Sequence, residues 1–109
     1  MNKLNVADVA GQLAEDGKTE TEVMREVSFS LQVMRFEPGD GDPMHAHAEE
    51  EIYAINTGEA TLVTDDESME VESGDIVHLG SGTEHQFTDF SDEFVVTVMY
   101  APAEGSQAV

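Results

Sequence analysis

Residues 39–58 read GDGDPMHAHAEEEIYAINTG, and this stretch decides how the chain is interpreted. It holds two of the four histidines, His45 and His47, one residue apart, and Glu51 follows them. Because successive side chains of a strand point to opposite faces, the two imidazoles project the same way. If the chain folds back before Glu51, its carboxylate joins them and offers a divalent metal two nitrogen ligands and one oxygen ligand. The pattern predicts a metal site that takes a further ligand from downstream.

Residues 74–87, GDIVHLGSGTEHQF, supply the two other histidines. His78 lies within a predicted strand, whereas His85 follows a glycine-rich turn that can steer the chain inward. His85 is therefore the better ligand, and we interpret His78 as a strand histidine with satisfied hydrogen bonds or as a donor behind the ligands. The plain alternative, in which His45 and His47 are surface residues of an acidic loop, does not account for their joint spacing with Glu51 and His85.

The charge of the chain excludes several classes of partner. Asp and Glu number 24 against four Lys and Arg, which gives a formal net charge of -20. Nucleic acids and anionic membranes are bound by clustered basic residues, so neither is an expected partner. The acidity favours a salt-rich cytoplasm, as in halophiles, and the alternative is an acidic protein of a mesophile. With no cysteine in the sequence, disulfides, thiolate catalysis and Cys-based zinc sites are excluded.

Length and hydrophobic pattern predict one folded domain of 109 residues. No apolar run approaches the ~20 residues of a membrane span, so we expect a soluble, cytoplasmic protein. Residues 5–15 have helical spacing behind Asn5, a good N-cap. Many short strands with turn residues between them follow, which is typical of a barrel or sandwich. The run 94–100 is apolar on both strand faces and requires cover from a second layer or a second subunit.

Two motifs carry a resemblance to the cupin superfamily. The first cupin motif, G(X)5HXH(X)3E(X)6G, is matched at every position by Gly39, His45, His47, Glu51 and Gly58. The second, G(X)5PXG(X)2H(X)3N, is similar to residues 74–89, with Gly74, Gly82 and His85 in place. Gly80 stands where proline is usual and Asp89 where asparagine is, and neither departure touches a ligand.

The resemblance implies an all-β fold, an antiparallel jelly-roll β-barrel of the small single-domain type. It places an arm or short helix at residues 1–20, the barrel at 21–101 and a flexible tail at 102–109. It also implies one divalent ion (iron, manganese, nickel, zinc or copper), held by His45, His47, Glu51 and His85. Pairing of barrels is common in the family, so we expect a homodimer with a small-molecule ligand or substrate.

Three further residues have a functional and a structural interpretation. Tyr53 shares the face of Glu51 and is a candidate catalytic proton donor or orienting hydroxyl, or equally a core tyrosine. Arg35 would hold a substrate carboxylate, but a surface ion pair fits this acidic chain better. Glu49, like Glu50, is expected to be solvated.

Two functions follow from the sequence, and they belong to different classes. The first is a metal-dependent cupin acting on a small organic substrate, with dioxygenase, isomerase and lyase chemistry all compatible with the ligand set. The alternative is a non-catalytic, metal-containing module that binds or senses a small ligand. A metal-free cupin of the sugar-epimerase type is disfavoured, because all four ligand positions are retained. The step from fold to reaction rests on analogy alone.

Overall fold

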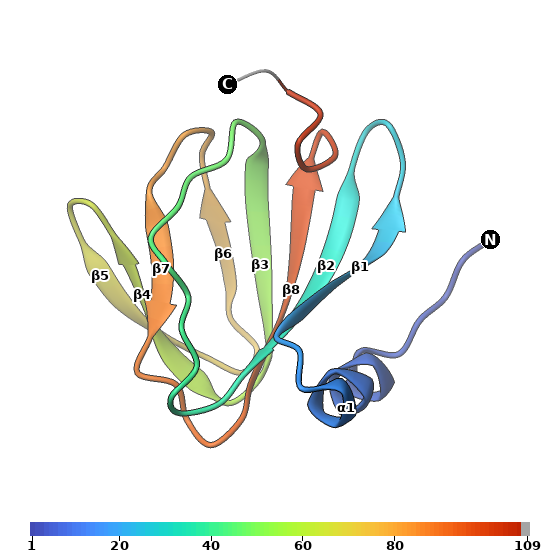
Figure 1. The fold of residues 1–109 in the computed structure, drawn as a ribbon. Helices are drawn as coiled ribbons and strands as arrows, with labels where there is room; N and C mark the ends of the chain where they lie inside the picture. Colours follow the sequence, from blue (N-terminus) through green and yellow to red (C-terminus); the bar gives the residue numbers. More distant parts are fainter. Residues whose placement is uncertain (108–109) are drawn as a thin grey trace.

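The structure is a computed structural model, and it describes residues 1–107 (Figure 1). One helix, α1 (Val6–Asp16), precedes the strands. Over the described residues the strands are β1 (Glu20–Arg25), β2 (Ser30–Phe36), β3 (Glu50–Thr57), β4 (Glu59–Thr64), β5 (Ser68–Glu72), β6 (Ile76–Leu79), β7 (His85–Thr88) and β8 (Phe94–Ala101). The expected all-β architecture with a short N-terminal helix is confirmed.

The strands form two antiparallel sheets. One has five strands in the order β1-β2-β8-β3-β6, and the other has three in the order β5-β4-β7. Figure 1 shows the five-stranded sheet on one side of the molecule and the three shorter strands on the other. β8 lies between β2 and β3, so the last strand of the sequence holds the middle of the larger sheet. In the pairing of β3 with β8, Glu51 lies opposite Tyr100 and Tyr53 lies opposite Val98.

The core lies between the sheets and follows from strand alternation. In β3, Glu51, Tyr53 and Ile55 are buried, while the residues between them are exposed or half-buried. β8 is buried on both faces over its first residues, as its composition predicts. Phe94, Val96 and Val98 face the main core together with residues of β4 and β7 such as Leu62 and Phe87.

Helix α1 covers part of the outer face of the larger sheet. The side chain of Asn5 accepts a hydrogen bond from the backbone N–H of Asp8 at 3.1 Å, which confirms the predicted N-cap. Leu13, together with Ala10, packs on Val33 and Val95. At Val95, the second apolar face of β8 is therefore covered by α1 of the same chain. Val95 thus does not require a second subunit to cover it. The homodimer stays a prediction.

A long irregular segment, residues 37–49, connects β2 to β3 and passes along β7 (Figure 1). Two backbone hydrogen bonds join it to the first residue of β7: His45 N–H donates to His85 O at 3.0 Å, and His85 N–H donates to His45 O at 2.8 Å. This bridge brings the two histidine motifs together. Within residues 1–107, no helix is long and apolar enough to cross a membrane.

The C-terminal segment 102–107 lies against the body of the fold. Ala103 is buried, and the N–H of Glu104 donates to the hydroxyl of Ser30 at 2.9 Å. The carboxylate of Glu49 accepts hydrogen bonds from the N–H of Gly105 at 3.1 Å and of Gln107 at 3.2 Å. The expected flexible tail covered residues 102–109, of which 108–109 lie outside the described residues.

Candidate functional site

The site is assembled from two regions of the chain that the backbone bridge joins. His45 and His47 come from the irregular segment before β3, and His85 is the first residue of β7. Glu51 and Tyr53 come from the buried face of β3. The single bridge between His45 and His85 fixes the register of both histidine motifs and brings their imidazoles together.

Three histidines form the centre of the site. His45, His47 and His85 each offer one nitrogen, and these atoms lie within 4.8 Å of one another. The ring centroids of His45 and His85 are 4.4 Å apart. The side chain of His85 is fully buried, whereas the two others are half-buried. The structure thus brings together the three histidines that the motifs select and leaves His78 outside.

Backbone carbonyls set which nitrogen of each ring is free. His45 Nδ1 lies 2.6 Å from Pro43 O, and His85 Nδ1 lies 2.8 Å from Thr83 O. A carbonyl oxygen only accepts, so Nδ1 carries the hydrogen in both rings and, in the neutral tautomer, Nε2 keeps its lone pair. Metal-binding histidines are usually oriented in this way by a second hydrogen bond.

Glu51 and Tyr53 form a buried pair beside the histidines. The Tyr53 hydroxyl donates to Glu51 Oε1 at 2.8 Å and lies 2.9 Å from His85 Nε2. Glu51 Oε1 is itself 3.4 Å from His85 Nε2. Glu51 is therefore adjacent to the cluster, although its oxygens are outside the group of nitrogens that lie within 4.8 Å of one another. The hydroxyl of Tyr53 links the predicted carboxylate ligand to one of the predicted imidazole ligands.

Burial and the carboxylate of Glu51 perturb the pKa values of Tyr53 and His85. Burial, and then the negative charge of Glu51, raise the pKa of Tyr53 far above its usual value, so the phenol keeps its proton at any ordinary pH. Burial lowers the pKa of His85, but the hydrogen bonds with Glu51 and Thr83 outweigh it and leave the pKa above its usual value. Tyr53 therefore stays protonated, and His85 takes up a proton more readily than a free histidine does.

A cavity of about 260 Å³ opens onto His45 and His47. Its lining residues come from both ends of the chain and from the motif segment; they are Glu20, Met34, Asp42, Pro43, His45, His47, Tyr53, Tyr100 and Glu104. Glu104 Oε2 lies 3.7 Å from His47 Nδ1. Sequence reasoning missed Glu20, Tyr100 and Glu104, because no motif spacing relates them to the histidines.

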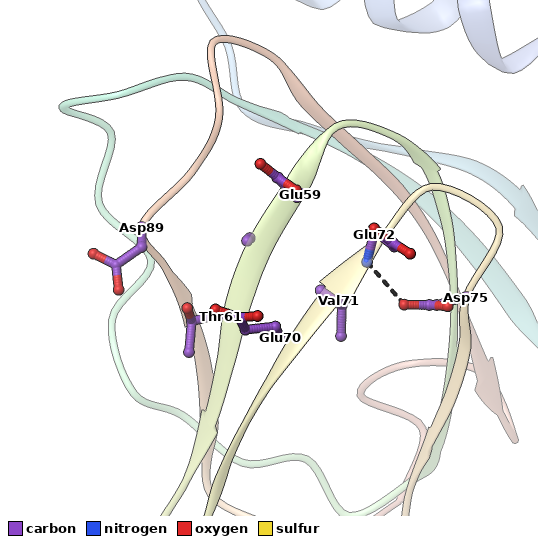
Figure 2. Close-up of a pocket in the computed structure, with 8 residues that line it drawn as sticks. Glu59, Thr61, Glu70, Val71, Glu72, Asp75 and Asp89 are labelled. Atoms are coloured by element: carbon purple, nitrogen blue, oxygen red, sulfur yellow. Dashed lines mark hydrogen bonds between the residues drawn. The ribbon is translucent and has the colours of Figure 1, made fainter.

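A larger concavity of about 630 Å³ lies over β4 and β5 (Figure 2). Its lining includes Glu59, Thr61, Glu70 and Asp89. Figure 2 shows Glu59, Thr61 and Glu70 on the strands and Asp89 apart from them, with the N–H of Glu72 donating to Asp75 at 2.8 Å. Its lining contains neither histidine nor tyrosine. The smaller cavity, which has both, is the candidate site.

The other residues singled out by sequence lie away from the cavity. His78 is exposed on the outer face of β6, with Nε2 2.8 Å from Glu50 Oε1. Arg35 forms ion pairs with Glu93 at 2.7 Å and Glu37 at 3.3 Å, which agrees with the expected surface role. The expectation that Glu49 is solvated is wrong: it is 2% exposed. Its carboxylate is buried because it takes up backbone N–H groups of the C-terminal segment.

Comparisons with known proteins agree with this arrangement. The sequence profile of the cupin domain matches residues 32–101. An uncharacterized protein of Streptomyces coelicolor is 28% identical over 95 residues, which cover 87% of this chain and 90% of that protein. The matched residues include both histidine motifs.

Two solved structures superpose well on this one. An uncharacterized conserved protein with a double-stranded β-helix domain from Klebsiella pneumoniae has a TM-score of 0.81 at 18% identity, covering 94% of this chain and 90% of that chain. The DMSP lyase DddQ from Ruegeria pomeroyi has a TM-score of 0.71 at 22% identity, covering 88% of this chain and 52% of that chain. At these identities the likeness concerns the fold alone, and the expected jelly-roll arrangement is confirmed.

Proposed function

Because the chain belongs to the family of cupin domains, we propose that it is a metal-dependent cupin that acts on a small organic molecule. One observation carries the proposal: three imidazoles converge within 4.8 Å, and the Nδ1 atoms of two of them, His45 and His85, are held by backbone carbonyls. This leaves the Nε2 lone pairs of these two rings available to ligate a metal ion. A surface role for the histidines would not require such orientation.

The donor set fits a divalent transition metal. Imidazole nitrogens suit zinc, copper, iron and nickel, and a carboxylate suits manganese as well. His45, His47 and His85 would hold the ion, and Glu51, whose Oε1 lies 3.4 Å from His85 Nε2, would complete the set. When bound, the ion would supply Lewis-acid or redox chemistry to a coordinated molecule. The burial of His85 and Glu51 favours this assignment, because buried charged groups are normally paired or bound to metals.

Tyr53 is the candidate orienting hydroxyl in this proposal. Tyr53 lines the cavity, and its hydroxyl keeps its proton because it is buried beside Glu51. With its single O–H given to Glu51, the phenol oxygen can accept a hydrogen bond from a molecule that reaches it. Glu51 accepts from the same hydroxyl at 2.8 Å and so orients it. The positioning of Tyr53 depends on Glu51, whichever group holds the metal.

The volume of the cavity limits the size of the molecule that it can hold. Its volume of about 260 Å³ falls slightly below the ~300–1,000 Å³ of pockets for drug-sized ligands. The ligand class is therefore a small organic molecule. Oxygenase, isomerase and lyase reactions all remain compatible with the site, and the likeness to a lyase from Ruegeria pomeroyi supports the fold only.

Incubation of metal-loaded protein with small polar compounds, followed by mass spectrometry, tests the proposal. We expect at least one compound that binds to be converted, and conversion to be lost in His47→Ala. The matched control is His78→Ala, because His78 lies on the outer face and should leave the rate unchanged. Conversion only in air indicates a dioxygenase, and conversion without oxygen indicates an isomerase or lyase. If every tightly bound compound is recovered unchanged from protein that is fully loaded with metal, the protein is a non-catalytic binding or sensing module and not an enzyme.

A further inference from the structure

The cavity that His45 and His47 line, here called the histidine cavity, has a negatively charged wall. Glu20, Asp42 and Glu104 all contribute to it, and no lysine or arginine is among its described lining residues. A basic residue that contacts this wall is Arg25, which donates through Nη2 to the backbone oxygen of Glu104 at 2.8 Å. Its other nitrogen, Nη1, is paired with Glu22 at 2.7 Å, so its charge is already compensated. The cavity presents three carboxylates with no matching cation.

Two of these carboxylates accept hydrogen bonds from the fold. The Glu20 carboxylate accepts a hydrogen bond from Nε2 of Gln32. Asp42 Oδ2 accepts from the N–H of Phe87 at 2.8 Å. Glu104 is fixed through its backbone, whose N–H donates to Ser30 at 2.9 Å, while its side chain is 34% exposed. Glu20 and Asp42 are therefore partly pre-organised for a donor, although Glu20 is an exposed residue.

Gln32 supports Glu20 from behind. It is 7% exposed, and its Nε2 donates to the carboxylate of Glu20. Its Oε1 is a buried acceptor with no hydrogen-bond partner among the described residues, but Gln32 is not one of the residues that line the cavity. The acceptors that a ligand in the cavity meets are therefore the lining carboxylates.

We propose that the cavity takes a small organic cation, an amine or ammonium compound with N–H donors, and selects against organic anions. The proposal rests on the proposed function for the site and adds the class of molecule. Even with a divalent ion bound, the carboxylates of Glu51 and of the cavity wall outweigh the charge of the metal. An ammonium group toward Glu20 and Glu104 is attracted and gains acceptors, whereas a carboxylate there meets like charge.

Three probes of nearly equal size test the charge preference: ethanolamine as the cation, ethylene glycol as the neutral compound and glycolate as the anion. Each is titrated into zinc-loaded protein at fixed ionic strength, and binding is followed by NMR shifts of the Tyr53 and Tyr100 signals. The zinc content is measured afterwards to verify that no probe has removed the metal. We expect ethanolamine to bind at least tenfold more tightly than glycolate, with ethylene glycol between them. Equal or tighter binding of glycolate would overturn the proposal.

Variants separate the cavity from the general negative charge of the chain. Glu104→Gln and Glu20→Gln should each reduce the preference for ethanolamine several-fold. Among the described residues, Glu20 is hydrogen-bonded to Gln32 and forms no ion pair with a histidine, so its replacement leaves the metal ligands in place. The control is Glu70→Gln, which removes the same charge from the larger concavity over β4 and β5. A loss in Glu70→Gln as large as in Glu20→Gln would mean that the cavity has no preference of its own.

A failure of the metal assignment is distinguished from a failure of this inference. If wild-type protein takes up no zinc, the proposed function is wrong, and the same three titrations on metal-free protein decide the charge preference. The carboxylates are present in both forms, so the order of the probes should persist. If wild-type protein binds zinc as proposed but the zinc-loaded form binds glycolate more tightly than ethanolamine, the inference is wrong and the proposed function stands.

Discussion

The hydroxyl of Tyr53 lies between two buried groups, 2.8 Å from Glu51 Oε1 and 2.9 Å from His85 Nε2. Tyr53→Phe should retain the ring packing on Phe87, whose ring centroid lies 5.2 Å away. It leaves two buried polar groups without their partner, so we expect a loss of about 1–3 kcal/mol in the free energy of unfolding of the metal-free protein. Denaturant unfolding measures this.

Tyr100→Phe is the matched control for that variant. Tyr100 lies in the same cavity, but its neighbour Glu104 is 34% exposed and can be hydrated instead. The loss in Tyr100→Phe should therefore be clearly smaller. An equal loss in both variants would show that the Tyr53 hydroxyl has no special role between Glu51 and His85.

Glu49 should hold the C-terminal segment in place. Glu49→Gln exchanges one of two acceptor oxygens for a donor that faces the N–H groups of Gly105 and Gln107. We expect faster hydrogen exchange at these two amides and a loss of about 1–3 kcal/mol in stability. Glu50→Gln, a change of the same charge at the exposed neighbour, should leave both amides protected. Equal exchange in the two variants would contradict the anchoring role.

The motif glycine Gly58 is required by a close approach of the backbone. Its φ is 78°, and a Cβ there would collide with the backbone oxygen of Glu93 and the hydroxyl of Ser91. Gly58→Ala should cost more than the roughly 1–3 kcal/mol of a strained backbone position alone. Gly11→Ala is the control, since its Cβ meets no atom within 4 Å and a helix interior favours alanine. A mild effect at Gly58 in thermal unfolding would contradict this.

Added salt should stabilise the protein. The net charge of -20 is spread over a small fold, and the Debye length falls from about 10 Å at about 0.1 M salt to about 3 Å at about 1 M. We expect the melting temperature to rise over this range, and to rise equally in sodium and potassium chloride if screening is the cause. An unchanged melting temperature would remove the argument for a salt-rich compartment.

The sequence predicted the centre of the site because its residues are close in sequence or tied to turns. His45, His47 and Glu51 follow one motif, and His85 follows a glycine-rich turn whose direction the motif encodes. The helix after Asn5 was also predictable, because capping and spacing act locally. The antiparallel sheets followed from period-two alternation and turn residues.

The rest of the site depends on contacts that only the folded chain creates. Glu49, Glu50 and Glu51 look alike in the sequence, yet Glu49 is buried because backbone N–H groups from residues 105 and 107 reach it. Glu20 and Glu104 enter the cavity from opposite ends of the chain. No local pattern identifies such residues, because their neighbours are set by strand order rather than by spacing. The homodimer also stays a prediction, because it depends on contacts between two chains.

Calorimetric titration of metal-free protein with zinc tests the central claim most directly, because it measures whether the three histidines form one metal site. We predict about one ion per chain for wild type and for His78→Ala. In His47→Ala the affinity should fall by more than the roughly 10–100-fold that follows loss of a group that only orients a ligand. An unchanged affinity and stoichiometry in His47→Ala, or an equal loss in His78→Ala, would contradict the assignment.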